Sequence, residues 1–292
     1  MSWNILRVLT ANVCNYCCLY CHNEGQSVAT EKKYLSFEQF KRVMKKISGS
    51  TISEIRFSGG EPLINKDTID MIEWVDRNTN CEVGLATNGS LITESLAARL
   101  ATTRVMVTMH FPAINPENYF KITGGDKKFF DKCIELFDRY EIDYSFNYVL
   151  YPNTIENLDD VINYSVARGK RLKLLPYLEH DFKNFSADMI KNIGERLKKF
   201  DVQKTRDEIN GITWWKFQNG AAIKLLDSPC YEKNIVKCRA YGEIRLLPSM
   251  ELQTCIFGRS LKLNEDDDLN KILDELWDNF RACPQLKEAR KN

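Results

Sequence analysis

Three cysteines stand close together near the start of the sequence, at Cys14, Cys18 and Cys21. Thiolates are soft ligands that suit iron–sulfur clusters, and closely spaced cysteines on one loop commonly hold them. Three thiolates can hold three corners of a four-iron, four-sulfur cluster and leave the fourth iron open to a small molecule. The spacing therefore predicts such a cluster, with the adjacent Cys17 as a non-ligand. A structural zinc loop completed by His22 is the alternative.

Polar or glycine-rich residues stand at the ends of six short β-rich runs. In parallel α/β proteins the carboxyl ends of the strands meet at one edge of the sheet, and chemistry gathers there. The cysteine loop follows the first run, so we expect the ends of the other runs to lie beside it. Those ends are Ser58-Gly59-Gly60-Glu61-Pro62, Thr87-Asn88-Gly89, Thr108 with His110, Asn147, and Leu175-Pro176.

Short β-rich runs alternate with longer amphipathic segments. The predicted strands are Ile5–Thr10, Ile52–Phe57, Glu82–Ala86, Val105–Met109, Tyr144–Leu150 and Leu172–Leu175. The predicted helices are Ser36–Ile47, Asp67–Arg77, Phe129–Tyr140, Ile155–Arg168 and Asp188–Phe200. Repeated strand–helix units imply a parallel sheet, and six units are enough for an open barrel. The predicted fold class is α/β, a partial (β/α)6 TIM barrel.

The pattern changes after about residue 205, which divides the 292 residues into a barrel, 1–205, and a small C-terminal α+β extension, 206–292. Two strands are predicted around an Asn219-Gly220 turn, because Asn-Gly is a strong hairpin signal. A second hairpin is predicted over Glu243–Leu247 and Glu251–Cys255, followed by a helix over Leu269–Arg281.

Charge and composition exclude several classes of protein. Forty-one basic residues face 40 acidic ones, so nothing favours nucleic acid as a partner. The N-terminal residues have no long apolar stretch, so no signal peptide is expected, and no apolar run is long enough for a membrane span. Ten cysteines without a secretion signal indicate a reducing compartment and metal ligation rather than disulfides. We therefore expect a cytoplasmic protein.

Over roughly residues 4 to 180, the cysteine loop and the strand-end motifs resemble those of radical S-adenosylmethionine (radical SAM) enzymes. The resemblance implies that the fourth iron chelates AdoMet and that the reduced cluster cleaves it to a 5′-deoxyadenosyl radical, which abstracts a hydrogen atom from the substrate. It also implies a reducing partner such as flavodoxin or ferredoxin. The residues that it assigns to AdoMet are Tyr20, Gly59, Gly60, Glu61, Pro62, Thr87, Asn88, Thr108, Asn147 and Leu175.

The resemblance also gives these residues individual roles. Tyr20 and Leu175 would lie near the adenine, and Thr108 and Asn147 would bond the ribose or the carboxylate. The glycines would let the backbone approach the cofactor closely, which a Cβ would hinder.

The C-terminal cysteines Cys230, Cys238 and Cys255 stand in a segment that resembles the C-terminal region of the molybdenum-cofactor GTP 3′,8-cyclase family and the twitch and SPASM extensions. Such extensions carry an auxiliary iron–sulfur cluster, so one auxiliary [4Fe-4S] cluster is predicted here. Cys283 is a possible fourth ligand. Three ligands would leave the cluster able to bind substrate, whereas four would suit electron transfer. Unligated core thiols are the alternative.

Compared with the cyclase family, the sequence keeps some substrate positions and changes others. Arg7, Arg56, Thr87 and Arg245 match nucleotide-binding positions, and arginine there suits phosphate or carboxylate. Ordinary salt bridging is the alternative for the arginines. Ser145 stands in place of a lysine, Glu243 of an arginine and Tyr241 of a cluster cysteine, and the chain ends without the family's Gly-Gly. We therefore expect a relative of the cyclase rather than the cyclase itself.

Three functions remain open from the sequence. The first is a radical SAM enzyme that acts on a small substrate, anionic or neutral, such as a nucleotide, sugar or cyclitol derivative. Its reaction would be cyclisation, oxidation or epimerisation. His110 would face that substrate, or be an ordinary polar residue. The second is modification of a precursor peptide, although a barrel that begins near residue 4 is expected to leave no separate leader-binding domain. The third is a non-catalytic zinc or iron–sulfur binding module.

Overall fold

The N-terminal part of the molecule consists of parallel strands joined by helices. The computed structural model describes residues 3–21, 31–177, 186–207, 211–226, 234–284 and 286. The strands are β1 (Ile5–Ala11), β2 (Glu54–Gly59), β3 (Glu82–Thr87), β4 (Met106–His110), β5 (Tyr144–Leu150) and β6 (Arg171–Pro176). The helices are α1 (Phe37–Lys46), α2 (Thr68–Asn78), α3 (Glu94–Leu100), α4 (Pro116–Thr123), α5 (Lys127–Arg139), α6 (Leu158–Ala167) and α7 (Ser186–Leu197), with short 3-10 turns η1 (Pro62–Ile64) and η2 (Ile155–Asn157).

The C-terminal part extends both edges of the same sheet. Its elements are β7 (Gln203–Asp207), β8 (Ile212–Lys216), β9 (Ala222–Leu226), α9 (Ile235–Tyr241), β10 (Glu243–Leu247), β11 (Glu251–Gln253), β12 (Ser260–Lys262) and α10 (Leu269–Asn279). The twelve strands lie in the order β12-β11-β10-β1-β2-β3-β4-β5-β6-β9-β8-β7. Strand β10 pairs with β1 and β9 with β6, both in parallel. The result is an α/β fold with one large, mostly parallel sheet.

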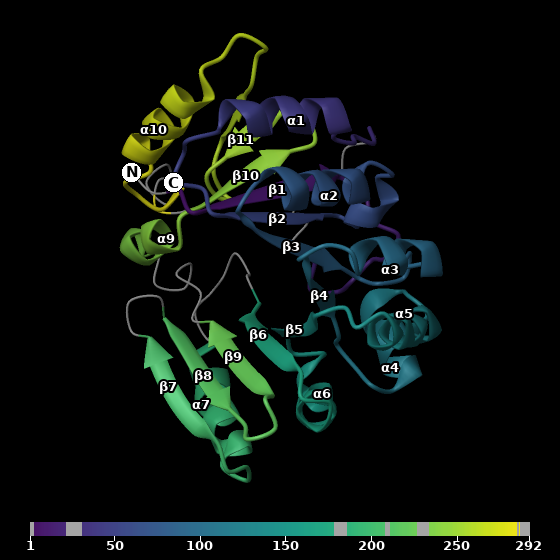
Figure 1. Cartoon of the computed structure of the whole chain (residues 1–292). Coiled ribbons are helices and arrows are strands. Elements are labelled where there is room, and N and C mark those ends of the chain that lie inside the picture. Colours follow the sequence, from purple (N-terminus) through teal and green to yellow (C-terminus); the bar gives the residue numbers. More distant parts are fainter. Residues whose placement is uncertain are drawn as a thin grey trace.

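The two faces of this curved sheet differ in chemistry. Helices α1 to α5 follow one face (Figure 1), where the strands bury apolar residues such as Phe57, Val107 and Phe146. Successive strand residues point to opposite faces, so the alternate positions lie on the other face, here called the inner face. Arg56, Thr108 and Asn147 stand at these alternate positions. The inner face is therefore polar where the helix-facing side is apolar.

The end of the chain packs against its beginning. The indole Nε1 of Trp3 donates a hydrogen bond of 2.8 Å to the carbonyl of Leu273 in α10, and the rings of Trp3 and Trp277 lie 4.9 Å apart. From α9, Arg239 donates to the carbonyls of Trp277 and Phe280 at 2.7 and 2.8 Å. The two contacts of Arg239 add donors to carbonyl groups in and just after the last turn of α10, where carbonyls lack the usual partner four residues on.

The six N-terminal strands predicted from the sequence are confirmed to within two residues at each end, as are the two C-terminal hairpins and the last helix in outline. The sequence missed α3, α4, α9, β7 and β12. Strand β7 runs across residue 205, so the division of the chain at that point stays a prediction. Among the described residues, no helix has the length and apolar character that crossing a bilayer requires.

Candidate functional site

The cysteine loop follows β1 and is fixed against the end of α4. The backbone N–H of Cys17 donates to the carbonyl of Thr123, and that of Leu19 to the carbonyl of Ile122, both at 2.9 Å. Gly124 has φ of 70° and lies so close to the loop that a Cβ there would meet the Cys17 sulfur at 2.6 Å. The loop therefore has a defined backbone path, and the exposed Cys17 thiol lies against this glycine.

The thiols of Cys14, Cys18 and Cys21 are partly buried on this loop. Burial raises the pKa of Cys14 to about 11 and that of Cys18 to about 12, because desolvation disfavours a thiolate. The Cys14 sulfur accepts the backbone N–H of Tyr16 at 3.4 Å. A metal displaces the thiol proton outright, and N–H groups aimed at sulfur tune iron–sulfur clusters. Three such thiols on one loop fit a cluster with one open iron.

The glycines at the end of β2 make close contact with the base of this loop. A Cβ on Gly59 would lie 2.5 Å from the carbonyl oxygen of Ala11, and one on Gly60 would lie 2.1 Å from that of Val13. The N–H groups of Gly60 and Glu61 donate to the same two carbonyls at 2.9 Å. Only glycine permits this approach. Their first task in the structure is thus to join β2 to the cysteine loop, and contact with a cofactor stays a prediction.

Glu61 ties the end of β2 to the end of β3. Its buried carboxylate accepts the Thr87 hydroxyl at 2.7 Å, the Asn88 N–H at 2.8 Å and the Leu63 N–H at 3.1 Å. Burial raises the pKa of Glu61 to about 7. Pro62 then starts η1, and its carbonyl accepts hydroxyl groups at the base of the site. Thr87 is therefore positioned by Glu61 rather than presented freely to a ligand.

Asn88 connects this network back to the cysteine loop. Its side-chain amide donates to Asn15 Oδ1 at 2.9 Å and approaches the Cys14 sulfur at 3.9 Å. Its Oδ1 atom accepts the N–H and the hydroxyl of Ser90 at 2.9 and 2.6 Å. The ends of β1, β2 and β3 thus form one hydrogen-bonded rim, as the sequence predicted for the strand ends.

Further along the inner face, polar atoms lack partners. Ser58 Oγ and Asn147 Oδ1 are inaccessible to solvent and make no hydrogen bond to the described residues. Buried polar groups of this kind are rare unless a ligand or water satisfies them. Thr108 shares a 3.1 Å hydrogen bond with Ser145, so its hydroxyl is engaged within the sheet. The orphaned atoms fit a polar cofactor or substrate above the sheet.

Tyr20 and His110 were predicted for different ligands, yet they touch one another. Their ring centroids lie 4.7 Å apart with the planes inclined by 60°. Tyr20 is buried, whereas His110 is partly exposed on β4. Leu175 lies in register with Val149 on the inner face of β6. Contact with adenine stays a prediction for Tyr20 and Leu175, as does contact with substrate for His110.

Two of the three predicted substrate arginines are held by carboxylates. Arg7 makes a bidentate pair with Glu243, both contacts 2.7 Å. Arg56 makes a bidentate pair with Glu54 and donates to the Tyr241 hydroxyl. Glu243 and Tyr241, where the sequence analysis finds departures from the cyclase family, thus engage these guanidinium groups together with Glu54. The third, Arg245, is buried on β10 in register with Arg7.

Two lysines that sequence reasoning missed lie on the inner face. Lys173 of β6 and Lys224 of β9 are direct neighbours in register. Burial, together with the charges of Arg56 and Lys224, lowers the pKa of Lys173 to about 7. The available signal was the alternation with Leu172 and Leu174, because a lysine between buried leucines on an internal strand must face the inner side.

The predicted auxiliary ligands lie in three separate elements. Cys238 is in α9, Cys255 follows β11, and Cys283 is buried after α10. Cys230 lies outside the described residues, as does His22 of the zinc alternative. The Cys255 sulfur accepts the Phe257 N–H at 3.5 Å, the same pattern as at Cys14. In the described part of the chain, no three His, Cys, Asp or Glu side chains are grouped to hold a single metal ion. The auxiliary cluster stays a prediction.

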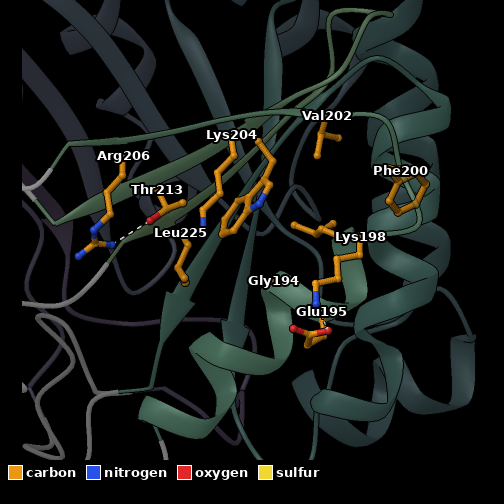
Figure 2. Close-up of a pocket in the computed structure, with 11 residues that line it drawn as sticks. Gly194, Glu195, Lys198, Phe200, Val202, Lys204, Arg206, Thr213 and Leu225 are labelled. Atoms are coloured by element: carbon orange, nitrogen blue, oxygen red, sulfur yellow. Dashed lines mark hydrogen bonds and ion pairs between the residues drawn. The ribbon is translucent and has the colours of Figure 1, made fainter.

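A separate hollow of about 500 Å³ lies between α7 and strands β7 to β9 (Figure 2). Its walls include Lys204, Arg206, Thr213 and Trp215, and Arg206 donates to the Thr213 hydroxyl at 2.9 Å. Trp215 pairs with the buried Ile223, so these residues lie on the helix-facing side of the sheet. The hollow is thus on the opposite face from the two lysines and is not part of the site.

Comparison with known proteins gives a consistent result. The model of the Radical SAM superfamily matches residues 8–164, more than half of the chain. A protein named Probable GTP 3′,8-cyclase from Methanococcus aeolicus is 28% identical over 212 residues, which cover 70% of this chain and 66% of that protein. A protein of the same name from Saccharolobus islandicus is 26% identical over 289 residues, which cover 93% of this chain and 86% of that protein.

Among solved structures, Streptococcus suis SuiB bound to S-adenosylmethionine is similar to this chain, with a TM-score of 0.70 and 13% sequence identity. The match covers 94% of this chain and 65% of SuiB. SuiB bound to its precursor peptide SuiA gives a TM-score of 0.71. At this identity the likeness concerns the fold alone. The chain spans about two thirds of the length of the first relative and of SuiB.

Proposed function

Because the chain belongs to the radical SAM superfamily of enzymes, we propose that it cleaves AdoMet reductively and removes a hydrogen atom from a small anionic substrate on the inner face of the sheet. One observation carries this proposal: the three thiols lie on a loop that is hydrogen-bonded to the ends of the next two strands. When bound, the cluster and AdoMet supply the carbon radical that starts the reaction. The described residues supply the frame around it.

Each part of the rim has a distinct task in this proposal. Cys14, Cys18 and Cys21 would hold the cluster, and the Tyr16 N–H would stabilise the charge on Cys14 sulfur. Glu61 and Asn88 would fix the spacing between the loop and the ends of β2 and β3. The residues that the resemblance assigns to AdoMet would then line one wall of the cofactor site. At Gly59 and Gly60 the protein backbone could approach the cofactor closely.

The finer architecture is also part of the proposal. Six strand–helix units in parallel register support a partial TIM barrel, and the C-terminal strands on both edges support an extension packed on it. An auxiliary [4Fe-4S] cluster would use Cys230, Cys238 and Cys255, with Cys283 as fourth ligand. The N–H···S contact at Cys255, which repeats the one at Cys14, supports this assignment. Electrons would come from a small reducing protein.

The substrate is proposed to be small and anionic because basic side chains gather on the inner face. Five basic side chains lie there, those of Arg7, Arg56, Arg245, Lys173 and Lys224, whereas three carboxylates, those of Glu54, Asp207 and Glu243, lie near them. Relatives named Probable GTP 3′,8-cyclase support a nucleotide-like substrate class. The similarity to SuiB bound to its precursor peptide concerns the fold alone, so it is no evidence that this chain acts on a peptide.

The test is AdoMet cleavage by the full chain, reconstituted with iron and sulfide without oxygen. With two clusters it should bind about eight iron atoms and release 5′-deoxyadenosine on reduction. Replacing Cys14, Cys18 and Cys21 together with alanine should abolish 5′-deoxyadenosine, whereas Cys81→Ala should not. Replacing Cys230, Cys238 and Cys255 should remove about half of the iron. Continued cleavage by the first triple variant would end the proposal.

A further inference from the structure

Four residues form a continuous row across the inner face of β5, β6, β9 and β8. Asn147 is in register with Lys173, Lys173 with Lys224, and Lys224 with Trp214. Residues in register on neighbouring strands lie about 5 Å apart and share one face. Figure 1 shows β6 and β9 side by side in this part of the sheet. Two ammonium groups are therefore adjacent, with an amide on one side and an indole on the other.

The two ammonium groups differ from the arginines in having no carboxylate partner. Arg7 and Arg56 each make a bidentate pair with a glutamate. Lys173 and Lys224 make no ion pair and no hydrogen bond with the residues that the structure describes. Lys224 lies over the ring of Trp214, 5.0 Å from its centroid. Of Arg7, Arg56, Lys173 and Lys224, only the two lysines lack a carboxylate in direct contact within the described part of the chain.

Such a pair is unfavourable without an anion. Partial burial removes water from the ammonium groups, and each repels the other. The surroundings relieve this only in part. Arg56 of β2 and Arg7 of β1 add positive charge near Lys173, and Glu243 of β10 opposes it. Glu54 of β2 and Asp207 of β7 oppose the charge of Lys224, to which Arg56 adds, but none of these carboxylates forms an ion pair with either lysine. An oxyanion between the two groups would reverse the balance through two charge-assisted hydrogen bonds. The orphaned Asn147 Oδ1, next in the row, is an acceptor without a partner among the described residues and would take a donor group of the same ligand, such as a hydroxyl, beside its acidic group.

We propose that Lys173 and Lys224 form the subsite that binds the acidic group, a phosphate or a carboxylate, of the substrate, with Trp214 as its apolar wall. This rests on the function proposed above and narrows it: the anion is held by the lysine pair, because Glu54, Tyr241 and Glu243 already engage Arg56 and Arg7. Two ammonium groups suit one acidic group rather than an extended polyphosphate. Lys173 and Lys224 would then determine the specificity of the site for substrates that carry an acidic group.

The test is calorimetric titration of the reconstituted full chain at low salt with two probes. Inorganic phosphate represents a phosphate ligand and acetate a carboxylate ligand. We expect saturable binding of at least one probe, weakened at least about tenfold in Lys173→Met and in Lys224→Met. Lys204→Met, on the helix-facing side of the neighbouring strand β7, is the matched control and should bind as the parent does. The stronger probe identifies the chemical class.

Two further measurements separate this subsite from a structural role and from the proposed reaction. Lys173→Arg should retain binding, because it keeps the charge. Release of 5′-deoxyadenosine without substrate should be unchanged in Lys204→Met, which lies on the opposite face of the sheet. Absence of probe binding in the parent, equal binding in the methionine variants, or loss of binding in Lys173→Arg would each overturn the subsite. A parent that binds the probe but never cleaves AdoMet would instead overturn the proposed function alone.

Discussion

The rim around the cysteine loop and the row of Lys173 and Lys224 are both polar and partly buried, yet they differ in how their polar groups are satisfied. In the rim, Glu61 accepts three hydrogen bonds and Asn88 makes contacts with both of its side-chain polar atoms. In the row, Asn147 Oδ1 and the two ammonium groups lack such partners among the described residues.

This difference distinguishes a frame from a receptor. The hydrogen-bonded network of Glu61 and Asn88 specifies one arrangement, which is what the holding of a cofactor requires, although the Ser58 and Tyr16 hydroxyls beside it have no partner among the described residues. Unsatisfied buried groups cost stability, and proteins retain them where a ligand restores the missing interactions. Substitutions in the rim should therefore damage the fold and the cluster together, whereas substitutions in the row should leave the fold intact or stabilise it.

The largest effect is expected for Gly60→Ala in the rim. The new Cβ would lie 2.1 Å from the Val13 carbonyl oxygen and 2.9 Å from the Cys14 nitrogen, so backbone must move at the base of the cysteine loop. We expect a loss of at least about 3 kcal/mol in the free energy of unfolding and loss of the first cluster. Urea unfolding and iron analysis measure the two.

Gly194→Ala in α7 is the matched control for this substitution. A Cβ there meets no atom within 4 Å, so alanine should be neutral or should stabilise the helix slightly. If Gly60→Ala retained its iron and unfolded at the parent's urea concentration, the close approach of β2 to the cysteine loop would not matter for the cluster.

An intermediate effect is expected for Glu61→Gln. The amide keeps the shape of the side chain but places N–H groups where the carboxylate accepts from Thr87 or Asn88. Leaving one buried donor unsatisfied should cost about 1–3 kcal/mol and should loosen the contact between β3 and the cysteine loop. Urea unfolding measures the cost, and Glu82→Gln at the exposed start of β3 should change stability by less than about 0.5 kcal/mol. Equal effects of the two substitutions would contradict the role of Glu61.

The rim could be predicted from the sequence far better than the row. Polar residues after an apolar run are visible along the chain, and sequential parallel strands bring their ends together, so Cys14, Gly59 and Asn88 could be placed at one edge. The contacts that engage Glu61 could not be predicted, because they depend on the path of the backbone between β2 and η1. The predicted boundaries of the strands agree closely with the structure, because regular strands have a clear pattern of apolar residues.

The row depends on pairings between segments distant in sequence. The sequence predicted a hairpin around Asn219-Gly220, and β8 and β9 form it, but nothing local says that β9 also pairs with β6. Without that pairing, Lys173 and Lys224 read as two solvated lysines. Likewise, Glu243 was visible as a departure from the cyclase family, but its bidentate pair with Arg7 depends on β10 joining β1.

The smallest expected effect is a gain in stability for Lys173→Met, and its pH dependence sharpens the contrast with the rim. Burial lowers the pKa of Lys173 from 10.5 to about 7, so between these values the unfolded chain binds one proton more than the folded chain. The parent therefore gains stability as the pH rises from about 7 towards 10, by at most about 1.4 kcal/mol per pH unit. Below pH 7 the folded protein carries the full penalty of the charge.

Methionine removes both the charge and its titration at nearly constant length. The variant should thus be more stable than the parent by about 1 kcal/mol near pH 6.5. This advantage should be lost or reversed at pH 9, where most of the parent's Lys173 is neutral, because the parent gains up to about 1.4 kcal/mol per pH unit above pH 7. Urea unfolding at the two pH values measures it, with Lys204→Met on the opposite face as the control that shows no pH-dependent difference. A variant less stable than the parent at both values would mean that Lys173 has partners in the folded protein and that the row is a second frame rather than a receptor.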